Sequence, residues 1–245
     1  MSTTTRTAIV HDATAGTTAR RVVVIASLAA LAADLTFMAI IGAVIPPLAI
    51  FAVAVVVAVG ATRRWPRAGA IALGLIALLA NAGGLSFLLA DLSSPSDSIA
   101  FLWAVVSGGG RVVVIVAAVL ALRDRDGGAR RLATAAVALL GIAVIGSVGA
   151  RLSVSSDARL ASDVEVVATG ITFPERVSVP AGGAVLVDNR DPVRHTFAIE
   201  GTALDVLVEP RVQRRIEIDV PTGTYTFVCT VPGHESMTGT LEVQG

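Results

Sequence analysis

The chain has 245 residues, of which 54% are hydrophobic and only 16% are charged, and its mean hydropathy is +0.77. This length allows one or two domains. An ordinary soluble domain has about 25% charged residues, so the composition argues against a soluble globular protein. The formal net charge is zero, but residues 1–159 hold 13 Arg and 7 acidic residues, whereas residues 160–245 hold 6 Arg and 12 acidic residues. The basic clusters flank apolar runs, which gives nucleic-acid binding no support. The single cysteine excludes an intrachain disulfide.

Five apolar stretches in the first half are candidates for membrane-spanning helices, because about 20 apolar residues cross the hydrocarbon core of a bilayer. The second stretch is short, but Pro46-Pro47 makes a natural break before it and the arginines after it can extend to the interface. We therefore predict an α-helical membrane bundle of about five spans over residues 22–150. The spans are expected at about Val22–Val44, Pro47–Ala61, Ala68–Ala90, Ile99–Leu122 and Leu132–Ala150.

The arginines of the connecting segments predict the orientation of these spans. They occur in the N-terminal tail of residues 1–21 and in the second and fourth connectors, whereas residues 45–46 and 91–98 contain none. By the positive-inside rule the tail is expected in the cytoplasm, and five crossings then place the C-terminal half outside, as in a multi-pass cell-membrane protein. Cleavage of the first span as a signal peptide is an alternative that leaves four spans and the same location for the C-terminal half.

Three polar side chains fall inside the predicted spans, namely Asp34, Asn81 and Arg111. A lone charge near the middle of a span costs at least about 2.5–3.5 kcal/mol, so we expect Asp34 and Arg111 to form an ion pair. Such a pair could line a proton or ligand path. Alternatively, it could fix the packing of the helices, helped by the close approach that Gly108–Gly110 permit.

The sequence changes character after the last span. Residues 151–162 (RLSVSSDARLAS) are polar and rich in serine, and they predict a linker. Residues 163–245 contain short β-branched runs separated by turn residues at intervals of roughly 8–12, which is typical of a small all-β sandwich. Strands are expected at 163–168, 176–179, 184–189, 195–199, 204–208, 213–220, 224–230 and 238–243.

Four side chains in this second half have the chemistry of metal ligands. Cys229, His234 and Met237 fall within nine residues, and His195 lies 34 residues before Cys229, at the start of a predicted strand. One thiolate, two imidazoles and one thioether form the ligand set of a mononuclear blue-copper site, with the thioether as a weak axial ligand. A lone buried cysteine or histidine is more often a core residue, but the four residues together indicate a metal site. His11, in the polar tail, is expected to be a solvated residue.

Two segments around these residues resemble the cupredoxins of the plastocyanin, azurin and auracyanin type. They are residues 188–197 (DNRDPVRHTF) and 223–237 (GTYTFVCTVPGHESM). The resemblance covers roughly residues 163–244 and implies a Greek-key sandwich in which His195, Cys229, His234 and Met237 bind one copper ion. The Cys-x4-His spacing is similar to that of azurin, whereas His-x2-Met is one residue shorter. Thr196 stands where an asparagine often follows the first ligand histidine in this family.

Counting ligands excludes several copper enzymes. The binuclear site of cytochrome oxidase subunit II needs two bridging cysteines, and multicopper oxidases and copper nitrite reductases need further histidines, which this chain does not have. A single site filled by protein ligands has no open position for a substrate. We therefore expect that the chain is not an enzyme but a membrane-anchored type 1 copper protein that transfers one electron on the extracytoplasmic face.

The resemblance also suggests how electrons would enter and leave. In the family the C-terminal ligand histidine, here His234, reaches the surface and serves as the electron port. The expected partners are the lipid bilayer and a redox protein or respiratory complex, and the acidic second half favours a positively charged docking surface. Extracytoplasmic copper binding, delivery or sensing is the alternative function, and a third possibility makes the helices a docking platform for other subunits.

Overall fold

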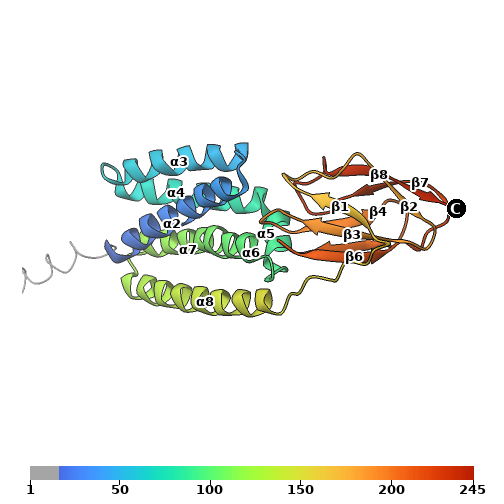
Figure 1. Ribbon diagram of the computed structural model, residues 1–245. Coiled ribbons are helices and arrows are strands. Elements are labelled where there is room, and N and C mark those ends of the chain that lie inside the picture. The colour runs from blue at the N-terminus through green and yellow to red at the C-terminus, as the bar shows by residue number, and fades with distance from the viewer. Residues whose placement is uncertain (1–16) are drawn as a thin grey trace, which may run out of the picture. The chain divides into compact units, whose positions relative to one another are not determined.

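The computed structural model describes residues 17–245 and divides the chain into two compact units, coloured along the sequence in Figure 1. The first unit contains the described residues up to Leu88 together with Leu102–Ile145, and it is helical. The second contains Leu89–Phe101 and Gly146–Gly245, and it holds the strands. Most of the expected N-terminal tail, including His11, lies outside the described residues.

The helices follow the apolar stretches of the sequence. Within residues 17–245, four helical stretches are long and apolar enough to cross a membrane, namely Thr18–Ile41, Pro66–Gly83, Ser98–Leu122 and Asp126–Leu152. The helix at the second expected span is shorter, with 17 residues. The protein therefore has a helical N-terminal region with several apolar helices, as expected for a membrane protein. The elements are α2 (Thr17–Ile41), α3 (Pro46–Thr62), α4 (Pro66–Gly83), α5 (Leu85–Leu92), α6 (Ser98–Trp103), the π-helical turn η1 (Ala104–Gly109), α7 (Gly110–Leu122) and α8 (Asp126–Leu152).

Small side chains let the helices of the first unit approach closely. Its buried core contains Leu73 and Val114, and its other members include three alanines on α4 and α7. A Cβ atom added at Gly74 would lie 3.2 Å from the Cβ atom of Ala118, so α4 and α7 meet at a glycine. Close approach between small residues is the usual way in which helices gain packing energy in a bilayer, where the lipid offers no hydrophobic driving force.

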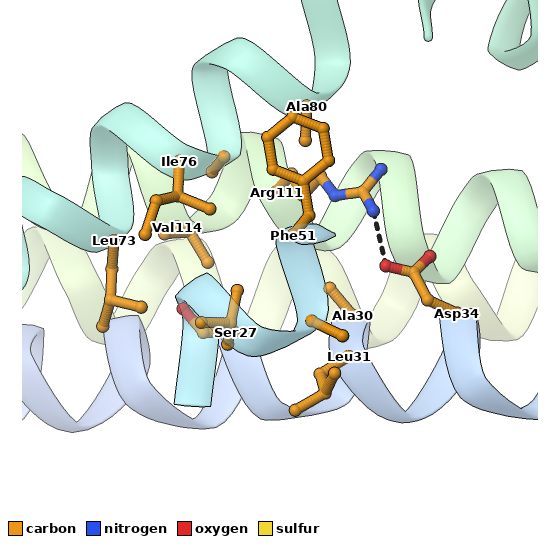
Figure 2. Close-up of a pocket in the computed structure, with 13 residues that line it drawn as sticks. Ser27, Ala30, Leu31, Asp34, Phe51, Leu73, Ile76, Ala80, Arg111 and Val114 are labelled. Atoms are coloured by element: carbon orange, nitrogen blue, oxygen red, sulfur yellow. Dashed lines mark hydrogen bonds and ion pairs between the residues drawn. The ribbon is translucent and has the colours of Figure 1, made fainter. Parts of the chain in front are cut away.

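The expected ion pair is present in this unit and forms part of a larger polar cluster. Asp34 on α2 accepts hydrogen bonds from Trp103 Nε1 (3.0 Å), Ser107 Oγ (2.6 Å) and Arg111 Nη2 (2.5 Å). The three donors are spaced by four residues along α6, η1 and α7, which places them on one helix face. Figure 2 shows the guanidinium of Arg111 directed at the Asp34 carboxylate.

This polar cluster (Asp34, Trp103, Ser107 and Arg111) favours a structural role over a ligand path. The Asp34 carboxylate is satisfied by three donors, and the side chains of Asp34 and Arg111 are only 5% and 8% exposed. The cavity beside them has a volume of about 20 Å³, which is room for about one water molecule. An organic ligand would not fit there.

The second unit is the β-sandwich that the sequence predicts, and its eight strands correspond to the eight expected ones. One sheet has the order β1-β3-β6 and the other has the order β2-β8-β7-β4-β5. Strands β1 and β3 are parallel, as are β2 and β8, and the remaining pairs are antiparallel. The strands are β1 (Val164–Ala168), β2 (Arg176–Pro180), β3 (Ala184–Asn189), β4 (His195–Ile199), β5 (Asp205–Val208), β6 (Gln213–Glu217), β7 (Gly223–Val228) and β8 (Thr238–Gln244).

Aromatic and branched side chains fill the space between the two sheets. Phe197 on β4 and Phe227 on β7 are fully buried and stack with ring centroids 5.0 Å apart. Phe173 packs against both rings. Cys229 and Met237 belong to the same buried core, so two of the expected metal ligands are packed against apolar side chains of the sandwich.

Part of the predicted linker is bonded to the sandwich. The backbone N–H of Asp157 donates to the carbonyl oxygen of Gln213 (2.9 Å), and its carboxylate accepts from the backbone N–H of Arg215 (3.0 Å). The hydroxyl of Ser156 accepts from the backbone N–H of Gln213 (3.2 Å). Serine and aspartate side chains therefore hold this segment along β6, although its sequence shows no strand pattern.

The buried pair of the first unit allows a double-mutant test. Removing one partner of a buried ion pair costs about 3–5 kcal/mol, because the other charge is left unpaired. We therefore expect Asp34→Asn and Arg111→Gln each to lower the free energy of unfolding strongly. The double variant should lower it by clearly less than the sum of the two single changes. Denaturant unfolding of the full chain in detergent measures these differences.

The Ser107→Ala variant is the control for this cycle. It keeps both charges and removes one hydrogen bond, so we expect a loss of about 1 kcal/mol. If the double variant lowers the free energy of unfolding by the full sum of the two single changes, Asp34 and Arg111 do not stabilise each other.

Candidate metal centre

The first expected ligand, His195, begins strand β4, and its side chain is fully buried. The loop before it is closed by Asn189, the last residue of β3, whose side-chain nitrogen lies within hydrogen-bond distance of three backbone carbonyl oxygens. The Asn189 side-chain oxygen accepts a hydrogen bond from the backbone N–H of Asp191 (2.9 Å). One buried amide therefore fixes the loop of residues 190–194 and with it the position of His195.

The other expected ligands lie in the loop between β7 and β8. This loop is closed by a hydrogen bond from the backbone N–H of Cys229 to the carbonyl oxygen of Met237 (3.0 Å). Inside it, His234 N–H donates to the carbonyl oxygen of Val231 (3.0 Å), and Met237 N–H donates to that of His234 (2.8 Å). Gly233 has a φ angle of +88°, a conformation that glycine adopts at no steric cost. The turn returns the chain to the point where β7 ended.

Three donor atoms from these two loops converge. His195 Nδ1 and His234 Nδ1 are 3.2 Å apart, and the sulfur of Cys229 lies 3.9 Å from the first and 3.6 Å from the second. A point equidistant from the corners of this triangle lies about 2 Å from each atom, close to the roughly 2.0–2.3 Å of metal–nitrogen and metal–thiolate bonds in zinc proteins. The three residues can therefore hold one metal ion without moving far, and they form a possible His-Cys-His metal site.

Met237 lies beside this triangle but is not one of its corners. Its side chain is fully buried in the core of the sandwich, and its backbone is bonded to Cys229 and His234. A thioether is a weak ligand that takes a long axial position in blue-copper sites. The axial role of Met237 stays a prediction.

The remote nitrogen of His195 has a charged partner. His195 Nε2 lies 2.9 Å from Asp191 Oδ2, and the Asp191 carboxylate also accepts the backbone N–H groups of Gly170 (2.7 Å) and Ile171 (3.0 Å). Although burial opposes it, these hydrogen bonds hold the pKa of Asp191 below its ordinary value. An ionised Asp191 accepts a hydrogen bond from Nε2–H of His195, so the Nδ1 atom of this ring keeps its lone pair for a metal ion.

Both imidazoles are held in the neutral form that binds metals. Burial lowers the pKa of His195, and the hydrogen bond and charge of Asp191 oppose the shift only in part. Burial and the neighbouring His195 lower the pKa of His234 to about 4. Neither ring therefore has to lose an imidazolium proton before it binds a metal ion at pH 7.

Thr196 and Thr230 connect the two loops at the thiol. The backbone N–H of Thr196 points at the sulfur of Cys229 (3.4 Å), as does its hydroxyl at 3.8 Å. The Thr196 hydroxyl also accepts the backbone N–H of Thr230 (2.7 Å). Thr196, which stands where the family often has asparagine, therefore joins the two ligand loops in this chain.

Sequence reasoning identified the four expected ligands but not the residues around them. Asp191, Asn189 and Thr230 were not singled out. A carboxylate four residues before a ligand histidine is a signal that could have identified Asp191, because ligating histidines usually donate their second N–H to such a group. No comparable signal marks Thr230, whose contact with Thr196 spans 34 residues.

Comparison with known proteins identifies the second unit. The family described as "Cupredoxin-like domain" matches residues 136–243. The copper-containing nitrite reductase NirK of Thermus scotoductus SA-01 is 22% identical with a TM-score of 0.30, and the match covers 38% of this chain and a quarter (25%) of that one. A chain of a heme-copper terminal oxidase dimer is 19% identical with a TM-score of 0.28, and the match covers 48% of this chain and 97% of that one. No curated protein matches the chain.

A helical region with several apolar helices is thus followed by a cupredoxin-like domain, which confirms the resemblance and the fold class predicted from the sequence. The chemistry of the donor atoms agrees with this fold. A thiol and two imidazoles in a buried triangle are donor groups that copper takes in trigonal sites.

The carboxylate behind His195 makes a testable contribution to metal binding. We expect Asp191→Asn to lower the affinity of the full chain for copper by about 10–100-fold, because the ring of His195 loses the partner that orients it. A competition titration against a coloured chelator measures the affinity. Asp188→Asn, which removes a carboxylate paired with Arg190 in the same segment, is the control and should bind copper as the parent does. Equal affinities of the two variants would contradict this role of Asp191.

Proposed function

We propose that the chain is a membrane-anchored electron carrier, in which one copper ion held by His195, Cys229, His234 and Met237 accepts and releases a single electron. The proposal rests on one observation, the buried triangle of donor atoms with sides of 3.2, 3.6 and 3.9 Å. Its three corners are filled by protein atoms, and the buried Met237 lies beside it. Such a site suits electron transfer better than the binding and conversion of a substrate.

Bound copper would supply the redox couple, and the residues of this chain would supply a fixed environment for it. The two loops are closed by backbone hydrogen bonds and by Asn189, so the donor atoms are placed before a metal arrives. A site whose ligands move little between oxidation states has a low cost of reorganisation. The N–H of Thr196 at 3.4 Å would stabilise negative charge on the sulfur of Cys229.

The two histidines differ in their access to solvent. His195 is fully buried, whereas His234 is partly exposed, and its neighbours Gly233 and Glu235 are exposed. We assign His234 as the position at which electrons enter and leave, as the resemblance implies. The excess of acidic residues after residue 160 favours a redox partner with a positively charged docking surface.

The arginine pattern supports a location for the copper domain. We propose that residues 1–21 face the cytoplasm, that residues 22–150 form the membrane domain, and that the domain of residues 163–245 follows the linker 151–162 on the extracytoplasmic side. The asymmetric distribution of arginine between connectors supports this orientation. A carrier in this position could serve a respiratory complex in the same membrane.

Voltammetry of the copper-loaded full chain in detergent tests the proposed function. A carrier should give a reversible one-electron wave that persists over repeated cycles. The Cys229→Ser variant is the matched control, since it replaces only the sulfur atom, and it should give no such wave.

A second measurement distinguishes transfer of electrons from delivery of copper. We expect the reduced parent chain to keep its metal when a competing Cu(I) acceptor is added. An irreversible wave together with rapid loss of Cu(I) to the acceptor would contradict electron transfer and favour copper delivery.

A further inference from the structure

The residue before the first metal ligand is a buried arginine. Arg194 is 5% exposed, and its side chain is directed at residues 89–101, which belong to the same compact unit as the strands. An isolated buried guanidinium is strongly unfavourable, so its partners must be supplied by the fold. Neither the metal ligands nor the linker supplies them.

Two aspartates of the segment 89–101 pair with Arg194. Asp91 Oδ1 lies 2.8 Å from Arg194 Nη2, and Asp97 Oδ2 lies 3.4 Å from Arg194 Nη1. The same Asp97 oxygen accepts the backbone N–H of Arg194 at 2.9 Å. Asp97 is 1% exposed, so this contact is shielded from solvent and from salt.

Asp97 is itself fixed by the start of helix α6. Its second oxygen, Oδ1, accepts the backbone N–H of Ala100 (3.2 Å), and its own N–H donates to the carbonyl oxygen of Ser94 (3.1 Å). A carboxylate in this position satisfies a free N–H group at the helix N-terminus. One side chain therefore joins a helix start to the peptide group that leads into His195.

The geometry points to Asp97 as a positioning residue for the metal ligand His195, with Asp91 and Arg194 as its partners, and this inference rests on the proposed function. Asp97 holds the backbone of residue 194, while Asn189 and Asp191 hold the rest of the loop and the ring. The cluster of Asp91, Asp97 and Arg194 carries two negative charges and one positive charge, next to a residue that binds copper. This negative excess favours Cu(II) over Cu(I) and lowers the reduction potential of the site.

Three single variants of the full chain test this inference. Asp97→Asn keeps the shape of the side chain but removes its charge, and Arg194→Gln removes the positive charge from the same cluster. Asp163→Asn is the matched control, because Asp163 is an equally buried carboxylate that pairs with an arginine, Arg215 Nε at 3.0 Å, and caps Leu160 N–H at 2.7 Å. All three variants break an ion pair of a buried carboxylate, but only the first two lie beside the expected metal ligands.

The reduction potential is the first readout. We expect Asp97→Asn to raise the potential, Arg194→Gln to lower it, and Asp163→Asn to leave it at the parent value. A merely structural role of the cluster would not move the potential in opposite directions. If Asp97→Asn and Asp163→Asn both have the potential of the parent, the inference is overturned.

Hydrogen exchange in the copper-free chain is the second readout, and it does not depend on metal. Loss of the hydrogen bond to the charged carboxylate should speed exchange of the Arg194 amide by about tenfold in Asp97→Asn, with no change in Asp163→Asn. Unchanged exchange would overturn the positioning role.

If the parent chain binds no copper, the proposed function and this inference fail together. If the parent chain binds copper but the Asp97 and Arg194 variants change neither the reduction potential nor the exchange of the Arg194 amide, only this inference is overturned.

Discussion

The close approach of two imidazole nitrogens is the constraint on which the second unit depends. His195 Nδ1 and His234 Nδ1 lie 3.2 Å apart beside the thiol of Cys229. Because Asp191 accepts a hydrogen bond from Nε2–H of His195, the Nδ1 atom presents a lone pair. The hydrogen bonds of Asp191 and Asn189 and the closed loop between β7 and β8 hold these donor atoms in place. A metal ion in the triangle would satisfy all three donors at once.

The fold holds this arrangement from both sides. The sandwich core includes Cys229 and Met237 together with the stacked rings of Phe197 and Phe227, which ties the second loop to the core. Asn189 closes the first loop from inside, and Asp97 bonds to the backbone of Arg194 from outside. Because each of these contacts is buried, the ligands are held by groups that solvent does not compete for. Under the proposed function, these buried contacts would let the site keep one geometry while its charge changes by one unit.

The sequence was sufficient for the features that depend on local patterns. Alternating runs of branched residues between turn residues predicted the eight strands, and the composition of the spans predicted the apolar helices. The ligand loop was predictable because Cys229, His234 and Met237 lie close together in the chain. The pairing of Asp34 with Arg111 was predictable because two lone charges in apolar helices have few other partners, but the donors Trp103 and Ser107 were not anticipated.

Contacts between residues that are far apart in the sequence could not be predicted from local patterns. The third expected span is interrupted near Gly84, where α4 ends and α5 begins, and the division of the chain assigns residues 89–101 to the unit that contains the strands. Asp97 and Arg194 are separated by 97 residues, and a charged residue in a connector normally indicates solvent exposure. Only the structure shows that both are buried and paired.

The visible spectrum of the full chain in detergent during titration with Cu(II) tests the central claim most directly. If the cysteine and the two histidines hold copper in a trigonal plane, an intense blue thiolate-to-copper band should develop up to one equivalent. The band should bleach on reduction and should be absent in Cys229→Ser. A colourless chain, or a weak band that Cys229→Ser retains, would show that the triangle is not a blue-copper site.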